Sequence, residues 1–131
     1  MHGAPLQVEC QVISVHEGRF AEEQPRHGGK TEYDMSPTAI VQTKTGLTLQ
    51  ITTHRTAPWS LRQLTHCDLA PTDFRIIVAK GVNAPLAAYA DVCPHFFRVD
   101  TPGVTTANLS RLDYAKRRNE MYPFELHAVW R

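Results

Sequence analysis

Apolar and polar residues alternate near the start of the chain and predict a β-strand. The apolar positions and the polar positions between them are Leu6, Val8, Cys10 and Val12, and Gln7, Glu9 and Gln11. A period of two is typical of a strand with one buried face. We therefore expect the apolar set to face a core.

The stretch from Arg19 to Asp34 has no such pattern. It consists mostly of charged or small residues and contains the pair Gly28 and Gly29. This composition is typical of a surface connection. The sequence therefore predicts an exposed loop between two strands.

Two β-branched runs follow and predict an antiparallel hairpin. They cover Thr38 to Thr43 and Leu47 to Thr53, and Lys44-Thr45-Gly46 joins them. A short connection that contains Gly suits a hairpin. Three alternate apolar residues of the second run are expected to face the core: Leu47, Leu49 and Ile51.

Proline and apolar spacing predict two short helices. The first follows Pro58 and carries Trp59, Leu61 and Leu64 at near-helical spacing. The second begins around Asn83 and Pro85 and covers Leu86 to Val92.

Two apolar runs flank the second helix and predict strands. Phe74 to Ala79 is almost wholly apolar, as in a strand covered on both faces, and Phe96 to Val99 follows the helix. The order strand, helix, strand predicts a parallel pair with a right-handed crossover. The expected fold is α+β: a mixed β-sheet with an antiparallel hairpin, one right-handed βαβ crossover and few short helices.

Composition narrows the class of protein. The chain has 131 residues, 42% of them hydrophobic, which suits a single domain over residues 1–131. A formal net charge of +1 gives no field that would attract nucleic acid or an anionic membrane. There is no apolar run of about 20 residues and no signal-peptide pattern, so we expect a cytoplasmic protein. The cysteines Cys10, Cys67 and Cys93 form no Cys-x-x-Cys pair and are expected to be buried free thiols.

Two short motifs raise the possibility of nucleotide binding and are then rejected. Asp100-Thr101-Pro102-Gly103 has the Asp-x-x-Gly form found in GTPases, and Gly29-Lys30-Thr31 has the end of a phosphate-binding loop. That loop also requires a Gly five positions before Gly29, where Gln24 stands. We therefore expect no nucleotide partner, and a simple turn at Asp100.

Metal binding and nucleophilic catalysis have little support in the sequence. The seven histidines show no His-Glu-x-x-His motif, although Asp34, His54 and His95 remain open as ligands that the fold could bring together. Ser60 and Ser110 lack a nucleophile-elbow pattern. We expect no catalytic residue and no metal ligand in this chain.

One group of residues is a candidate binding site for a substrate or a partner. Lys80 and Asp100 follow the two predicted parallel strands, where open α/β sheets place ligands, and the amides near Gly81 and Thr101 lie beside them. Arg111 opens a basic cluster with Lys116, Arg117 and Arg118. The alternative is that Lys80 and Asp100 form a surface ion pair and that the basic cluster is a solvated face.

Longer stretches resemble a known family. "FRIIVAKGVNAPLAAY", "VDTPGVTTANLSRLDYAKRR" and "YPFEL", together with "HGAPLQVECQV" and "MSPTAIVQTKTGLTLQITTHRTAPW", are similar to the C-terminal domain of the microcystinase C (MlrC) family of zinc metallopeptidases. In that family, the larger N-terminal domain carries a zinc site built from Asp, Glu and His. Nothing in this chain resembles those motifs, and it departs from the family in beginning close to the first strands of the C-terminal domain.

The resemblance implies an accessory role. The chain would be the C-terminal portion of a zinc-dependent peptidase or amide hydrolase, lacking the first strand and the N-terminal zinc domain, and inactive alone. The alternative is an independent, non-catalytic binding or protein-interaction domain. In either case, we expect it to meet the missing metallopeptidase domain or to self-associate through exposed aromatic residues: Trp59, Tyr122, Phe124 and Trp130.

Overall fold

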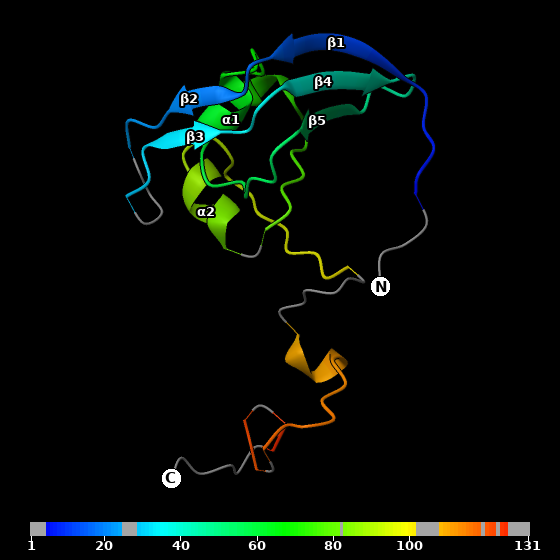
Figure 1. Ribbon diagram of the computed structural model, residues 1–131, viewed down its shortest axis with the longest axis vertical. Helices are drawn as coiled ribbons and strands as arrows, with labels where there is room; N and C mark the ends of the chain where they lie inside the picture. Colours follow the sequence, from blue (N-terminus) through cyan, green and yellow to red (C-terminus); the bar gives the residue numbers. More distant parts are fainter. Residues whose placement is uncertain are drawn as a thin grey trace. The chain divides into compact units, whose positions relative to one another are not determined.

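The structure is a computed structural model that describes residues 5–24, 29–81, 83–101, 108–118, 120–122 and 124–125 (Figure 1). The chain divides into two compact units. The larger spans Leu6–Phe96, and the smaller combines Met1–Pro5 with Phe97–Arg131. Each unit is described on its own below.

A three-stranded antiparallel sheet forms the centre of the larger unit. It consists of β1 (Cys10–His16), β4 (Thr38–Thr43) and β5 (Thr48–Thr52), with β4 in the middle (Figure 1). The predicted hairpin is confirmed, since β4 and β5 pair antiparallel from Thr38↔Thr52 to Gln42↔Thr48. At the turn, Gly46 has a φ of 85° and its N–H donates to the carbonyl of Thr43.

The first strand begins later than the sequence pattern predicts and contains a β-bulge. Val12 lies opposite Val41, whereas Ser14 lies opposite Ile40, so that Ile13 is the extra residue. Leu6 and Val8 precede the strand and are exposed, and Val12 is exposed within it. The predicted buried face of this segment is therefore wrong. Alternation identifies two faces of a strand, but it does not say which one a second layer covers.

The predicted loop between Arg19 and Asp34 is wrong at both ends. β2 (Arg19–Ala21) and β3 (Glu32–Asp34) pair antiparallel as a separate two-stranded sheet. Phe20 and Tyr33 are buried and stack with ring centroids 5.0 Å apart. Each strand has a single apolar residue between charged or small neighbours, which is too short a pattern to show a period of two.

The core of the larger unit lies where these strands meet the segment after α1. Its buried residues are Phe20, Tyr33, Met35, Ile40 and Cys67, with Leu69 packed against them. Leu47 and Ile51, which were predicted to face the core, are exposed. The first of the two predicted helices is a single turn, α1 (Arg62–Thr65), which starts four residues after Pro58.

The second predicted helix is confirmed in a shorter form. α2 (Ala84–Tyr89) follows Asn83 and has Pro85 in its first turn, with Ala88 and Tyr89 buried. Proline suits this position because the first amides of a helix have no partner within the helix. Two 3-10 turns, η1 (Pro71–Asp73) and η2 (Leu109–Arg111), complete the described elements.

The two strands predicted around α2 are absent. Residues 74–79 and 96–99 are described and form no strand, and every strand pair in the described part of the chain is antiparallel. Val78 and Phe97 are each 90% exposed. Apolar β-branched composition gives a segment the propensity for a strand, but a strand also needs a neighbour to pair with. The α+β class holds, but without these two strands the described residues form no βαβ crossover.

No helix in the described part of the chain combines the length and the apolar character needed to cross a bilayer.

Candidate functional site

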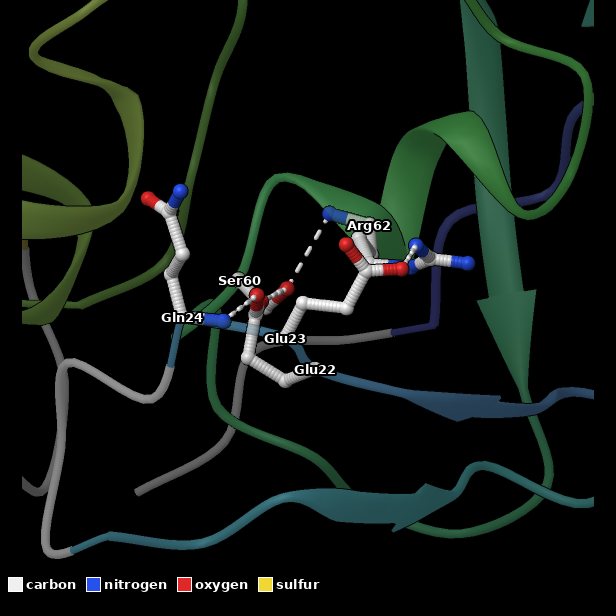
Figure 2. A network of polar contacts seen from close by, with 5 residues as sticks. All are labelled: Glu22, Glu23, Gln24, Ser60 and Arg62. Atoms are coloured by element: carbon white, nitrogen blue, oxygen red, sulfur yellow. Dashed lines mark hydrogen bonds and ion pairs between the residues drawn. The ribbon is translucent and has the colours of Figure 1, made fainter.

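The most connected polar group in the larger unit joins the end of β2 to the start of α1. Figure 2 shows Ser60 beside Glu22, with Glu23, Gln24 and Arg62 around them. The Ser60 hydroxyl donates a short hydrogen bond to the carboxylate of Glu22, and Ser60 is only 2% exposed. The backbone N–H of Gln24 donates to the same carboxylate at 3.0 Å.

Ser60 is buried because it caps α1. Its Oγ accepts a hydrogen bond from the backbone N–H of Arg62 at 3.0 Å, and its own N–H donates to Oε1 of Gln63 at 3.1 Å. These two bonds form a Ser-x-x-Gln cap one residue before Leu61, although Oγ of Ser60 binds the N–H of Arg62 and not that of Gln63 as in a strict capping box. The spacing of Ser60 and Gln63 in the sequence is a cap signal, and it was missed because Ser60 was weighed only as a nucleophile.

These contacts join two segments that are distant in the sequence. Glu22, Ser60 and Arg62 are together called the clip below. Both the donor and the acceptor capacity of Ser60 Oγ are used by Glu22 and Arg62. Arg62 also pairs with Glu23 at 3.3 Å, but the side chains are 45% and 83% exposed. An exposed pair of this kind contributes little to stability. The buried Ser60–Glu22 contact therefore carries most of the connection.

A surface cavity of about 220 Å³ opens beside this clip. Its lining residues are Glu22, Glu23, Gln24, Trp59, Ser60, Leu61, Arg62, Ala88 and Asp91. Three carboxylates and an indole ring favour a cationic group over an anionic one. Since Glu22 and Glu23 already bind Ser60 and Arg62, we interpret the cavity as the outer side of the clip.

The predicted binding residues lie in both units. Lys80 and Gly81 belong to the larger unit, and Asp100, Thr101 and Arg111 belong to the smaller one. Within the smaller unit, Nη1 of Arg111 binds Oδ2 of Asp100 at 2.9 Å, with side chains 57% and 44% exposed. The reason for placing Lys80 next to Asp100 was a pair of parallel strands, and neither strand is present.

Gly81 has a packing role that the sequence analysis did not anticipate. A Cβ at this position would lie 3.0 Å from Cδ of Pro85 and 3.3 Å from Cγ of Pro58. The absence of a side chain therefore allows the backbone to approach the start of α2 closely.

Two residues of the predicted basic cluster, Arg111 and Arg117, bind acidic residues of the smaller unit. Arg117 donates two hydrogen bonds to Glu125, at 2.9 and 2.6 Å, and its guanidinium lies 4.7 Å from the ring centre of Phe124. These hydrogen bonds raise the pKa of Arg117. With Arg111 bound to Asp100, two of the four basic side chains serve the smaller unit itself.

The described residues contain no group of three His, Cys, Asp or Glu side chains that could hold a metal ion. Asp34 is one of the three residues that the sequence leaves open as metal ligands, and its carboxylate binds Ser36 and Arg19 instead. The backbone N–H of Ser36 lowers the pKa of its carboxyl, and the charges of Arg19 and His54 lower it further. Arg19 Nε lies 3.2 Å from Asp34 Oδ2, and His95 is exposed.

The segment that resembles a phosphate loop has a different structural context. Gly29, Lys30 and Thr31 connect β2 to β3 and lead into a strand, whereas a phosphate loop leads into a helix. The ammonium of Lys30 lies 4.8 Å from the ring centre of Tyr33. Pro102 and Gly103 of the second motif lie outside the described residues.

The three cysteines are free thiols, as predicted, but the prediction that all are buried is wrong, because Cys10 and Cys93 are half-buried. Cys67 is buried in the core, and burial raises the pKa of its thiol. Of the four aromatic residues expected on the surface, Tyr122 is 67% exposed and Trp59 is 36% exposed. Phe124 is half-buried and packs edge-on against Tyr114 at 5.1 Å, and Trp130 lies outside the described part.

These observations define a chain of the α+β class with antiparallel sheets, whose described residues contain no group of side chains that could hold a metal ion. Residues 1–116 match the family described as "MlrC C-terminus", and the chain belongs to that family. The match covers the whole of the larger unit and part of the smaller one. Neither a curated protein nor a solved structure matches the chain.

Proposed function

We propose that the chain is the accessory C-terminal portion of an MlrC-like zinc-dependent peptidase or amide hydrolase. It would help to form or cover an active site whose metal ligands lie on another domain. The observation that carries the proposal is the family match, which covers 116 of the 131 residues. The partner is then a metallopeptidase domain, and zinc belongs to that partner.

Exposed apolar segments support a neighbouring domain. Ile76 and Val78 lie before α2, and Phe97 and Val99 lie after it, with exposures of 77% to 90%. Each unit thus exposes a pair of large apolar side chains, and exposed apolar groups of this kind favour a partner that covers them. A second domain would cover these side chains and give their backbone groups partners.

The binding role of Lys80, Gly81, Asp100, Thr101 and Arg111 belongs to this proposal. The cationic side chains of Lys80 and Arg111 suit a carboxylate or carbonyl of a substrate or of the partner domain. Asp100 orients Arg111 through their ion pair.

The test combines the purified chain with the separately expressed metal-binding domain of another family member, loaded with zinc. The chain alone is expected to hydrolyse no peptide amide. Added to the domain, it should raise kcat/KM by at least about tenfold, because positioning contributes that much or more to catalysis. Lys80→Ala and Arg111→Ala should each reduce the gain, whereas Arg55→Ala, an exposed substitution elsewhere, should not.

If the chain leaves the rate and KM of the metal-binding domain unchanged, the accessory role is refuted. The larger unit has its own core, built from Phe20, Tyr33, Met35, Ile40 and Cys67. That core favours the second candidate, an independent non-catalytic binding domain, in this outcome.

A further inference from the structure

One face of the β1-β4-β5 sheet is entirely apolar along two rows of paired residues. Val15, Ala39 and Ile51 form the first row, because Ala39 is paired with both of the others. Val12, Val41 and Leu49 form the second row in the same way. Directly paired residues share a face of a sheet, and Ala39 and Val41 are two positions apart. These six residues are called the outer face below.

The bulge in β1 makes this face possible. Val12 and Val15 are three positions apart, so in a regular strand they would point to opposite sides of the sheet. The extra residue, Ile13, lies between the pairs Val12↔Val41 and Ser14↔Ile40 and restores both valines to the same side.

The opposite face of the sheet is largely polar, although it is the face that packs inside the unit. In the row formed by Ser14, Ile40 and Gln50, the apolar residue is Ile40, which is 1% exposed. The adjoining row holds His16, Thr38 and Thr52. Gln50 Nε2 donates to the carbonyl of Gln63 at 2.6 Å, which ties this inner face to α1. A sheet with one solvated face normally shows the reverse, with polar residues outward.

The outer face leaves apolar side chains exposed on both edge strands. Val12 and Val15 on β1 are 60% and 67% exposed, and Ile51 on β5 is 54% exposed, whereas Val41 on the central strand is 7% exposed. The two edge strands therefore carry exposed apolar side chains on either side of β4, which lies between them in Figure 1. In face-to-face packing of two sheets, the side chains of one inner face fit between those of the other.

We propose that the outer face is the interface between two copies of this chain. The six residues carry no charge, so two identical faces can meet without repulsion between like charges. Near one end of the face, Lys44 and Glu9 neutralise each other at 2.7 Å. The net charge of the whole chain is only +1, which also permits association of identical molecules. This proposal is independent of the proposed function.

The size of the face determines how strong the association is. Three strands about 4.8 Å apart and a length of about four residues along each strand give an apolar footprint of about 200 Å² per copy. A stable interface buries about 1,200 Å² or more in total, so this face supports a weak, reversible dimer. Its dissociation constant should be on the order of 100 μM.

Sedimentation velocity across a dilution series tests the dimer. Between about 5 and 500 μM, a range chosen to bracket the expected dissociation constant, the mean mass should rise from one chain toward two. Raising the salt concentration should leave association unchanged or strengthen it, because the contact is apolar and not ionic.

Two substitutions at the outer face and one elsewhere separate this contact from others. Val15→Lys should weaken association by at least about tenfold, because it buries an unpaired charge. Val15→Thr keeps the shape and the β-branch and should weaken association by about threefold or more. Val78→Lys alters a side chain that is 90% exposed and off the face, and should leave association unchanged. Circular dichroism and urea midpoints establish that each variant is folded.

A wild-type chain that stays monomeric throughout the series would overturn the proposal. So would a dimer that Val15→Lys and Val15→Thr leave intact when both variants are folded. Loss of the dimer in Val78→Lys alone would assign the contact to the apolar segment before α2, and would equally reject the outer face.

Discussion

At the scale of single residues, Gly18 is the position where a side chain is least tolerated. It lies between β1 and β2 with a φ of 75°, and its carbonyl accepts a hydrogen bond from the N–H of Met35 at 2.8 Å. A Cβ would overlap the backbone carbonyl oxygen of Ser36 and press on Oγ1 of Thr38. The clash involves backbone, so no rotamer change can relieve it.

Gly18→Ala should therefore lower the free energy of unfolding by about 3 kcal/mol or more, the sum of the cost of a positive φ and a steric clash. Urea denaturation measures the effect. Gly46→Ala is the matched control, because Gly46 also has a positive φ but no heavy atom lies within 4 Å of an added Cβ. The control should lose about 1 kcal/mol, the backbone cost alone. Equal losses in the two variants would contradict the predicted clash.

At the scale of elements, α1 depends on its cap. The helix has four residues, too few to be stable by its own hydrogen bonds. Ser60→Ala removes the acceptor for the N–H of Arg62 and the donor to Glu22. The free energy of unfolding should fall by about 2 kcal/mol, the upper part of the range for loss of a helix cap.

Thr72→Ala is the comparison for Ser60→Ala. Thr72 is exposed in η1, and its substitution should change the urea midpoint very little. If both variants have the wild-type midpoint, the contacts of Ser60 do not stabilise the folded state, and the structural role assigned to the clip is wrong.

Comparison of the elements with the sequence shows what patterns can predict. The β4–β5 hairpin and α2 were predicted because a Gly-containing turn and an Asn–Pro start are local signals. The β2–β3 pair was missed because its strands of three residues depend on the stacking of Phe20 and Tyr33, which is a contact between distant positions. The Ser-x-x-Gln cap at Ser60 was readable in the sequence and was overlooked. Lys80 and Asp100 were predicted to be neighbours because each followed one of two parallel strands. The described residues do not form those two strands.

At the scale of the whole molecule, alkaline pH should weaken folding. Burial, with a smaller contribution from Cys93, raises the pKa of Tyr89 to about 12. The ordinary pKa of tyrosine is about 10, so the folded state holds this proton more tightly than the unfolded state does. The stabilisation is fully present below about pH 10 and is lost as the pH rises toward 12. The loss should be on the order of 2 to 3 kcal/mol.

Urea midpoints at a series of pH values from about 9 to 12 measure this loss. Tyr89→Phe keeps the ring and removes the ionisable group, so the slope of stability against pH should become smaller in this range. Tyr33, whose pKa is raised by burial and by Glu22, leaves a residual slope. An unchanged slope in Tyr89→Phe would show that other groups govern the alkaline transition.

The bulge at Ile13 means that β1 carries one residue more than its pairing with β4 requires. Deleting Ile13 would leave Val12 opposite Val41 and Ser14 opposite Ile40, so Val12 and Val15 would be two positions apart and would share a face without a bulge. In a regular strand, the same loss would shift every preceding residue to the other side of the sheet. In evolutionary terms, the bulge lets this strand lose one codon without any change in the set of side chains that it presents.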